Sequence, residues 1–178
     1  MTRLVLCRHA EAGNAEQARE LAAALAPLDV KSVYTSPLKR AVATSRAVAA
    51  RHGLVPVEVA DLREIDFGEA EGLAFAELPS ELQAGLLATP LTVRFPGGET
   101  YGELRERVCC ALAAIVAQHA GETVAVVTHA GSIRAALAAW LGIEGEGIFR
   151  IDQRTASVNI VEWFDGAPLV RLVNGSRP

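Results

Sequence analysis

The feature that most constrains the fold is a short apolar run at residues 4–7, near the start of the chain, which stops abruptly at Arg8 and His9. An uninterrupted apolar stretch of this length is typical of a strand buried on both faces, as in a parallel sheet covered by helices. Arg8 and His9 would then lie at the carboxyl end of the strand, which is the edge where open α/β sheets bind ligands. We therefore expect a ligand site at this edge.

A second apolar run, residues 122–128, ends in the same way, at His129. Because the carboxyl ends of parallel strands meet at one edge of a sheet, we expect His129 to lie near His9. A helix is predicted to follow at about residues 132–141. The unpaired backbone N–H groups near its start, including that of Ala130, favour binding of an anion.

A third segment leads to the same edge. Residues 29–35 predict a strand that ends at Ser36, and a serine followed by proline is typical of a helix start with the serine as N-cap. The predicted helix covers residues 38–52. Arg40 falls in its first turn, so its guanidinium group is expected near the two histidines.

The rest of the chain completes an α/β pattern. Apolar residues at helical spacing predict helices, and short apolar or alternating segments predict strands, the last two joined by a tight turn as an edge hairpin. These are the helices at about residues 16–28 and 100–119 and the strands at about residues 55–59, 156–164 and 169–173. The predicted fold is a three-layer α/β/α sandwich with a mostly parallel central sheet and an antiparallel edge strand.

A chain of 178 residues is near the usual size of one α/β domain, so we expect a single domain over residues 1–178. Its least regular part is residues 69–98, which end in a proline followed by Gly97 and Gly98. Irregular segments of this length often carry substrate contacts. We expect residues 69–98 to form a variable flap over the ligand site.

Composition limits the partners. A net charge of −4 argues against nucleic acid or an anionic membrane surface as a partner. No apolar run approaches the about 20 residues that cross a bilayer, and the first residues lack the layout of a signal peptide. We expect a cytoplasmic protein, as a monomer or as a homodimer formed through the edge hairpin.

Two arginines and two imidazoles directed at one point suit a small polyanion. Guanidinium groups pair with phosphate oxygens in a fixed geometry, so phosphate is the expected ligand of Arg8, His9, Arg40 and His129. Binding alone would not require two histidines. The constellation therefore indicates catalysis on a phosphate group.

Five motifs in this order resemble those of the histidine phosphatase superfamily, the phosphoglycerate mutase-like group: residues 8–11, 36–41, 62–68, 96–99 and 128–131. The resemblance implies that His9 is the nucleophile that takes the phosphoryl group. Arg8, Arg40 and His129 would hold the phosphoryl oxygens. Glu64 would protonate the leaving alcohol and later accept a proton from water.

Physical chemistry adds conditions to these roles. His9 must attack through a neutral nitrogen, so its other ring nitrogen should donate to a backbone carbonyl that fixes the tautomer. Glu64 must hold a proton near neutral pH, which requires burial or nearby negative charge to raise its pKa. Arginines and an imidazolium are expected to supply the positive charge, so no metal or other cofactor is expected.

The implied activity is a metal-independent phosphomonoesterase that hydrolyses small phosphate esters through phosphohistidine. The short first loop and residues 62–72 look most like the small bacterial branch that contains α-ribazole phosphatases and broad-specificity phosphatases. α-Ribazole 5'-phosphate is therefore a candidate among small phosphorylated metabolites. The alternatives are phosphoglycerate mutase, a phosphohistidine protein phosphatase, and a phospho-ligand binding module that has lost turnover.

Three positions depart from the family pattern. Ala10 replaces a common glycine, so the loop must accept a β-carbon. The usual long loop with a phosphate-contacting asparagine is short here, and Asn14 is the candidate for that contact. Ala70 stands where an aromatic residue is usual, which predicts a roomier substrate pocket.

Overall fold

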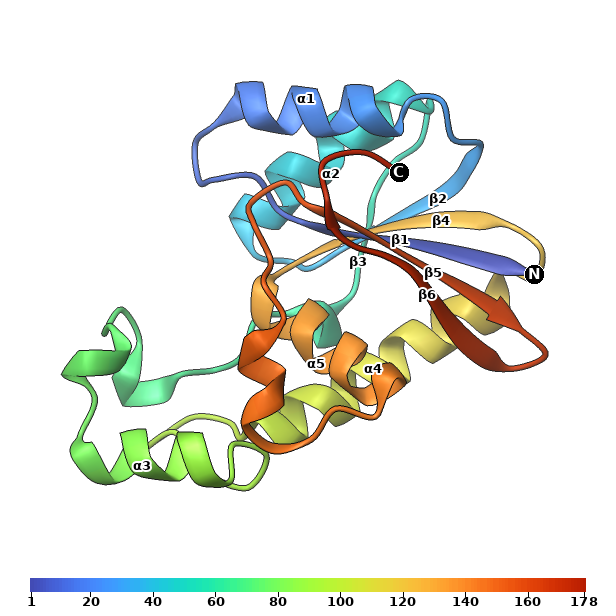
Figure 1. Ribbon diagram of the computed structural model, residues 1–178. Coiled ribbons are helices and arrows are strands. Elements are labelled where there is room, and N and C mark those ends of the chain that lie inside the picture. The colour runs from blue at the N-terminus through green and yellow to red at the C-terminus, as the bar shows by residue number, and fades with distance from the viewer.

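The computed structural model describes residues 1–178 as a six-stranded mixed sheet between two layers of helices, with strand order β3-β2-β4-β1-β5-β6 (Figure 1). Strands β1 to β4 run parallel to one another, whereas β5 is antiparallel to β1 and β6 is antiparallel to β5. The predicted α/β/α class is confirmed. The strands are β1 (Thr2–Arg8), β2 (Val30–Thr35), β3 (Val57–Glu58), β4 (Thr123–Thr128), β5 (Val158–Phe164) and β6 (Ala167–Gly175).

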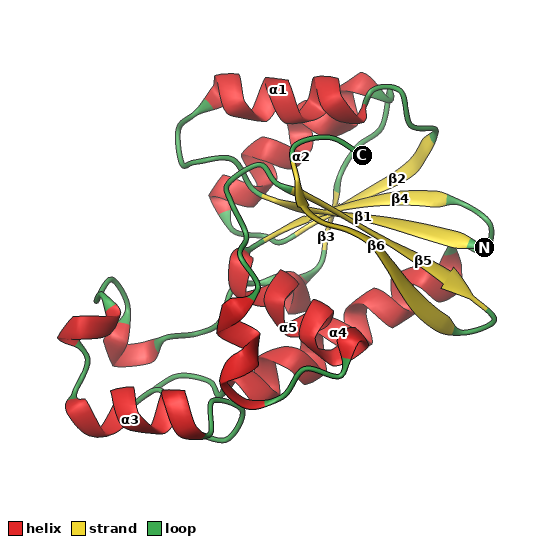
Figure 2. Ribbon diagram, in the orientation of Figure 1, coloured by secondary structure: helices red, strands yellow, loops and turns green.

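Helices cover both faces of the sheet. On one face lie α1 (Ala15–Leu25) and α2 (Lys39–Arg51), and on the other lie α4 (Tyr101–Gln118) and α5 (Ala130–Leu141) (Figure 2). Strand β1 contributes side chains to the hydrophobic cores on both faces of the sheet, because alternate side chains of a strand point to opposite faces. Leu4 and Leu6 join the core under α4 and α5, and Val5 and Cys7 join the core under α1 and α2. All four are fully buried, as the apolar run predicts.

Local signals explain most element boundaries. At the start of α4, the Thr100 hydroxyl accepts from the Glu103 N–H while the Glu103 carboxylate accepts from the Thr100 N–H, which is a capping box. Asp165 and Gly166 both have positive φ and form the two-residue turn of the β5–β6 hairpin. The predicted edge hairpin is confirmed.

Two boundary predictions are wrong. Ser36 is not the N-cap of α2, because the helix begins at Lys39 and its N-cap, Leu38, makes no side-chain capping bond. The Ser36 hydroxyl instead contacts His129. The strand expected at residues 55–59 shrinks to two residues, because its proline cannot donate to the neighbouring strand.

The flap, residues 69–98, stands apart from the sheet on the side of α4 and α5 (Figure 1). It contains the end of the short 3₁₀ turn η2 (Gly68–Ala70), the turn η3 (Phe75–Glu77) and helix α3 (Ser80–Ala88). A last 3₁₀ segment, η4 (Gly145–Arg150), packs beside α3. No helix of the protein combines the length and the apolar character needed to cross a membrane.

Candidate active site

His9 follows β1 directly, and its ring is almost fully buried. Its Nδ1 lies 2.6 Å from the carbonyl oxygen of Ala10. Because a carbonyl only accepts, Nδ1 carries the hydrogen and Nε2 keeps its lone pair. The Nε–H of Arg40 points at that lone pair, with a nitrogen–nitrogen distance of 3.1 Å. Burial lowers the pKa of His9, and Arg40 and Arg8 lower it further, against the opposing effect of the Ala10 carbonyl. His9 is thus a neutral imidazole with the fixed tautomer that the sequence analysis expects.

His129 is the N-cap residue of α5 and follows β4. Its fully buried ring lies edge-on to that of His9, with 5.0 Å between ring centroids. Nε2 lies 2.7 Å from the Ser36 hydroxyl, whereas the buried Nδ1 has no hydrogen-bond partner. Burial, assisted by the charges of Arg40 and Arg8, lowers the pKa of His129 to about 2.

This pKa corrects one expectation from the sequence. His129 in the free site is a neutral imidazole, so it does not supply the imidazolium charge expected there. The fixed positive charge of the constellation comes from Arg8 and Arg40. A neutral His129 can still donate one hydrogen bond through Nδ1.

Arg8 ends β1, and its guanidinium donates to the carbonyl oxygen of Gln153 at 2.5 Å. Three buried side-chain polar atoms of the protein lack a hydrogen-bond partner, and two of them are Nε of Arg8 and Nδ1 of His129. Unpaired buried donors are rare because they cost about 1–3 kcal/mol each. Oxygens of a bound anion would satisfy both of these atoms.

Glu64 belongs to the loop before η2, and its carboxylate reaches the start of α5, where it completes the constellation. Its carboxylate accepts from the backbone N–H of Gly131 at 3.2 Å and from that of Ile65 at 3.1 Å. Burial raises the pKa of Glu64, although these two hydrogen bonds and the charges of Arg40 and Arg8 oppose the shift. A β-carbon at Gly131 would lie 2.2 Å from Oε1 of Glu64, so only glycine allows this approach.

A further arginine, which the sequence analysis missed, holds the loop that carries Glu64. Arg107 on α4 donates to the backbone carbonyls of Asp61, Arg63 and Glu64 at 2.7–3.0 Å. It also makes two bonds to the carboxylate of Glu99, at 2.7 and 2.8 Å. Glu99 in turn accepts from the Asp66 N–H at 3.0 Å. The available sequence signal was Glu99 itself, which belongs to the motif at residues 96–99.

The remaining candidates have simpler environments. Asn14 is exposed, and its side-chain oxygen caps α1 by accepting from the Gln17 N–H at 3.0 Å. Ala130 is the first residue of α5. Ala10 is buried, does not have positive φ, and donates to the Thr44 hydroxyl at 3.0 Å. An alanine therefore fits this loop without backbone strain.

Two members of the constellation, Arg40 and Glu64, line a cleft of about 580 Å³, which Phe67 and Arg107 line as well. No group of three or more His, Cys, Asp or Glu side chains in the protein is arranged to hold a metal ion. The site therefore combines a fixed neutral imidazole, two guanidinium groups, a second imidazole and a carboxyl group with a raised pKa. This arrangement can bind a phosphoryl group, attack it and exchange a proton with its leaving group.

One family model and several known proteins match most of the chain. Residues 10–176 match the family model described as "Histidine phosphatase superfamily (branch 1)". The chain is 34% identical over 197 residues to the bifunctional protein Rv2228c of Mycobacterium tuberculosis. This match covers 97% of the chain and 54% of the relative. The chain thus spans about half the length of that relative.

Two other proteins match over most of both chains. Phosphoserine phosphatase 1 of Hydrogenobacter thermophilus is 27% identical over 195 residues, with coverage of 98% of this chain and 92% of its own. The solved structure of YhfR from Bacillus stearothermophilus superposes with a TM-score of 0.90 at 24% identity, covering 98% of each chain. The structural match supports the same fold.

Proposed function

The chain belongs to the histidine phosphatase superfamily, branch 1, and on that premise we propose that it is a metal-independent phosphomonoesterase that works through a phosphohistidine on His9. One observation carries the proposal. The Ala10 carbonyl fixes the tautomer of His9, burial and the two arginines favour its neutral form, and its Nε2 faces Arg40 in a site that also holds His129. An imidazole in this state is prepared to attack phosphorus.

Binding of the ester would use donors that the free protein leaves open. The phosphoryl oxygens would accept from Nε of Arg8 and Nδ1 of His129, the two buried atoms without partners. The guanidinium group of Arg40 would move from Nε2 of His9 to a phosphoryl oxygen, which frees the lone pair for attack. The N–H of Ala130, the first residue of α5, and the dipole of that helix would also favour the bound anion.

In the first step, Nε2 of His9 attacks phosphorus in line with the leaving oxygen. The new N–P bond forms as the P–O bond to the alcohol breaks, and protonated Glu64 gives its proton to the departing oxygen. The burial that raises the pKa of Glu64 supports this role, because it increases the fraction of carboxyl groups that hold a proton.

In the second step, the Glu64 carboxylate takes a proton from water, and the water oxygen attacks phosphorus. The N–P bond breaks and its electron pair returns to Nε2, which releases inorganic phosphate. Both the free histidine and the protonated Glu64 are regenerated. Positioning and charge neutralisation provide most of the catalysis in such transfers.

Glu64 also favours ester substrates over the alternatives. A phosphohistidine protein phosphatase expels a good leaving group and does not need an acid with a raised pKa, and a binding module would need neither His9 nor Glu64 as they stand. Among esters, α-ribazole 5'-phosphate and O-phosphoserine are the candidates, the second because of the relative in Hydrogenobacter thermophilus. A panel of phosphorylated metabolites that contains both, together with 3-phosphoglycerate, would rank them by kcat/KM.

Replacement of His9 by alanine tests the proposal. We expect His9→Ala to abolish hydrolysis of p-nitrophenyl phosphate. We also expect rapid alkaline quenching and mass spectrometry of the wild-type protein to find one phosphoryl group on His9. His52→Ala is the matched control, because His52 caps the far end of α2 from Arg40. Full activity of His9→Ala, or equal loss in His52→Ala, would refute the proposal.

A further inference from the structure

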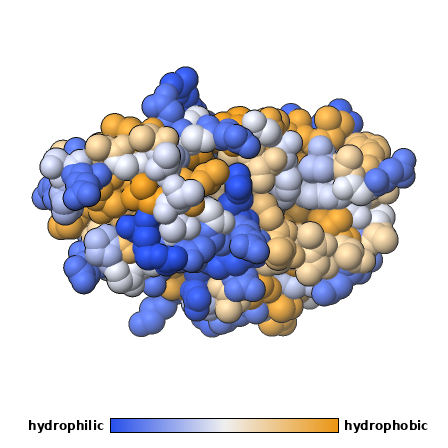
Figure 3. Space-filling view, turned by 90° about the horizontal axis from the view of Figure 1, so that it is seen from below, coloured by the Kyte–Doolittle hydropathy of each residue, from blue (hydrophilic) through white to orange (hydrophobic).

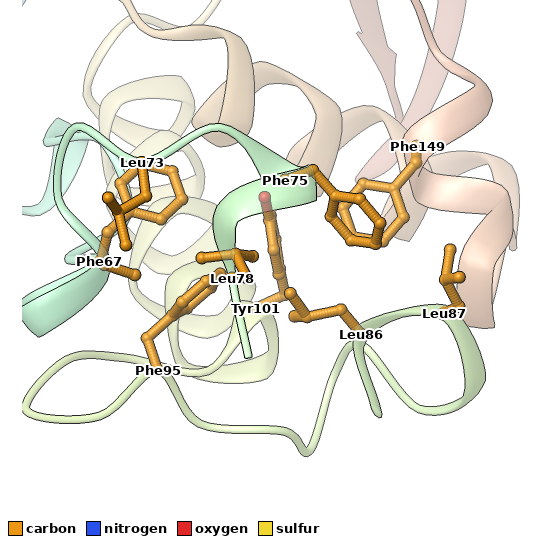
Figure 4. Close-up of a pocket in the computed structure, with 10 residues that line it drawn as sticks. Phe67, Leu73, Phe75, Leu78, Leu86, Leu87, Phe95, Tyr101 and Phe149 are labelled. Atoms are coloured by element: carbon orange, nitrogen blue, oxygen red, sulfur yellow. The ribbon is translucent and has the colours of Figure 1, made fainter. Parts of the chain in front are cut away.

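Beside the catalytic cleft lies a second cavity, of about 350 Å³, whose ten lining side chains are all apolar or aromatic (Figure 4). Most of the lining comes from the flap and its neighbour Phe67, and Tyr101 of α4 and Phe149 of η4 close the other side. The volume lies at the small end of ordinary ligand pockets, which suits one ring or a short branched chain. Ala70 contributes the smallest side chain of this lining.

Aromatic contacts make part of the cavity wall rigid. The rings of Phe67 and Phe95 meet edge to face at 5.1 Å, and those of Tyr101 and Phe149 meet in the same way at 5.2 Å. Phe95 and Tyr101 join the two pairs, with 6.3 Å between centroids. Edge-to-face aromatic packing stabilises the wall beyond the burial of its rings, so the wall is formed before any ligand binds.

The apolar cavity is adjacent to the reacting groups. Phe67 lines both this cavity and the cleft that contains Arg40 and Glu64. The phenol of Tyr101 supplies a polar atom at the cavity (Figure 4). Burial raises the pKa of Tyr101 to about 12, with a smaller contribution from Glu64, so the phenol stays protonated.

The rim of the cavity is apolar as well. Leu73, Phe75 and Leu87 line it and are 48%, 47% and 50% exposed. Large apolar side chains gathered around a hollow mark a binding site more often than scattered ones do. Figure 3 shows orange apolar residues at the α3 end of the molecule, next to a blue hydrophilic area.

Charge around the cavity limits what can enter. The flap, residues 69–98, contains four glutamates and one arginine; the glutamates are Glu69, Glu71, Glu77 and Glu81, and the arginine, Arg94, pairs with Glu103 of α4. The net negative charge of the flap disfavours an occupant that carries a carboxylate or a second phosphate. The occupant that fits is apolar and either neutral or cationic.

We infer that this cavity binds the alcohol half of the substrate, so that the preferred ester carries an aromatic or branched aliphatic group without negative charge. The inference rests on the proposed function, because it assigns the phosphate to His9 and the alcohol to the neighbouring cavity. It disfavours small acidic esters of the phosphoserine and phosphoglycerate kind as preferred substrates.

A series of ω-phenylalkyl phosphates tests the inference, with ethyl phosphate as the reference. All these alcohols leave with similar basicity, so differences in kcat/KM report binding of the chain and ring rather than leaving-group chemistry. Each buried methylene is expected to raise kcat/KM about fourfold, and we expect at least about tenfold once the ring reaches the cavity. 3-Phosphoglycerate should fall below ethyl phosphate.

Two variants fill the cavity in different ways. Ala70→Phe occupies it from the wall, and Leu87→Trp covers its exposed rim, where a larger side chain leaves the core intact. Each should reduce the ratio of kcat/KM for the phenylalkyl ester to that for ethyl phosphate about tenfold. Phe164→Ala is the control, because Phe164 is an exposed aromatic residue on β5, outside the cavity. Its ratio should equal that of the wild type.

A ratio near one in the wild type, or a ratio unchanged in both filling variants, would overturn the inference. Failure of the proposed function gives a different result, because the wild type would then hydrolyse no ester. In that case, calorimetric binding of non-hydrolysable phenylalkyl phosphonates to the wild type and to Leu87→Trp decides the inference alone. Equal affinity of the two proteins, or affinity no better than that for ethylphosphonate, would refute it.

Discussion

Replacing Ser36 by alanine tests how the site controls the proton of His129. The Ser36 hydroxyl oxygen lies 2.7 Å from Nε2 of His129 and also accepts from the Leu38 N–H at 3.3 Å. Its own hydrogen is therefore available to Nε2, which leaves the ring proton of His129 on Nδ1. That buried atom has no partner in the free protein, and it is the one that would donate to a phosphoryl oxygen. In Ser36→Ala the preference between the two tautomers is lost.

The size of the effect follows from the lost hydrogen bond. A neutral hydrogen bond contributes about 0.5–1.5 kcal/mol, and a buried atom left without its partner costs about 1–3 kcal/mol. Since about 1.4 kcal/mol is a factor of ten, kcat/KM should fall about 10- to 100-fold. Affinity for orthovanadate should fall by a comparable factor. The melting temperature should drop by a few degrees, about 2–4 °C per kcal/mol for a chain of this size.

Three measurements with one control separate this role from a structural one. Hydrolysis of p-nitrophenyl phosphate and inhibition by orthovanadate give the catalytic loss, and ring ¹⁵N shifts give the tautomer of His129 directly. Ser45→Ala is the control, because Ser45 is an equally buried serine whose hydroxyl donates to the Val42 carbonyl at 2.9 Å. It should lose stability but little activity. An Nε2–H tautomer in the wild type, or equal catalytic loss in Ser45→Ala, would refute the reasoning.

Three further predictions concern Glu64 and its supports. Burial lowers the pKa of His9 below its usual 6.5 and raises that of Glu64 above its usual 4.5. Activity needs neutral His9 and protonated Glu64, so kcat/KM for an alkyl phosphate should be bell-shaped, with its acid limb set by His9 and its alkaline limb set by Glu64. Glu64→Gln should remove the alkaline limb with p-nitrophenyl phosphate, and a limb that persists would exclude Glu64 as the acid. In Arg107→Lys, a single ammonium group cannot donate to the three carbonyls and to Glu99 together, so kcat for ethyl phosphate should fall at least about tenfold more than kcat for p-nitrophenyl phosphate. Arg105→Lys, on the same helix, is the control. Equal losses of kcat for the two substrates in Arg107→Lys would contradict a positioning role. Gly131→Ala would bring a β-carbon to 2.2 Å from Oε1 of Glu64, so its alkyl phosphatase activity should resemble that of Glu64→Gln, and wild-type activity would show that the carboxyl group need not occupy this place.

The sequence predicts the layout of the site well because short-range patterns determine it. Buried parallel strands appear in the sequence as apolar runs, and the carboxyl ends of these runs identify the edge of the sheet where Arg8, His9 and His129 meet. The tautomer of His9 also follows from local chemistry, since the accepting carbonyl belongs to the next residue. The roles of Ser36 and Arg107 depend instead on segments that are far apart in the chain, 93 residues for Ser36 and His129. A serine before a proline looks like a helix cap until the partner across the sheet is known.

The charge of the site is the point on which sequence and structure differ most. Counting basic residues suggests two guanidinium groups plus an imidazolium, but burial beside two arginines makes both imidazoles neutral and raises the pKa of Glu64. With Glu64 protonated, the constellation carries two positive charges, which match the dianion of a phosphate monoester. The bound phosphate dianion then neutralises the two guanidinium charges. The imidazoles stay neutral and Glu64 stays protonated, which are the states that attack and proton transfer require. The net negative charge of the flap would extend this selection, because it disfavours an alcohol that brings further negative charge.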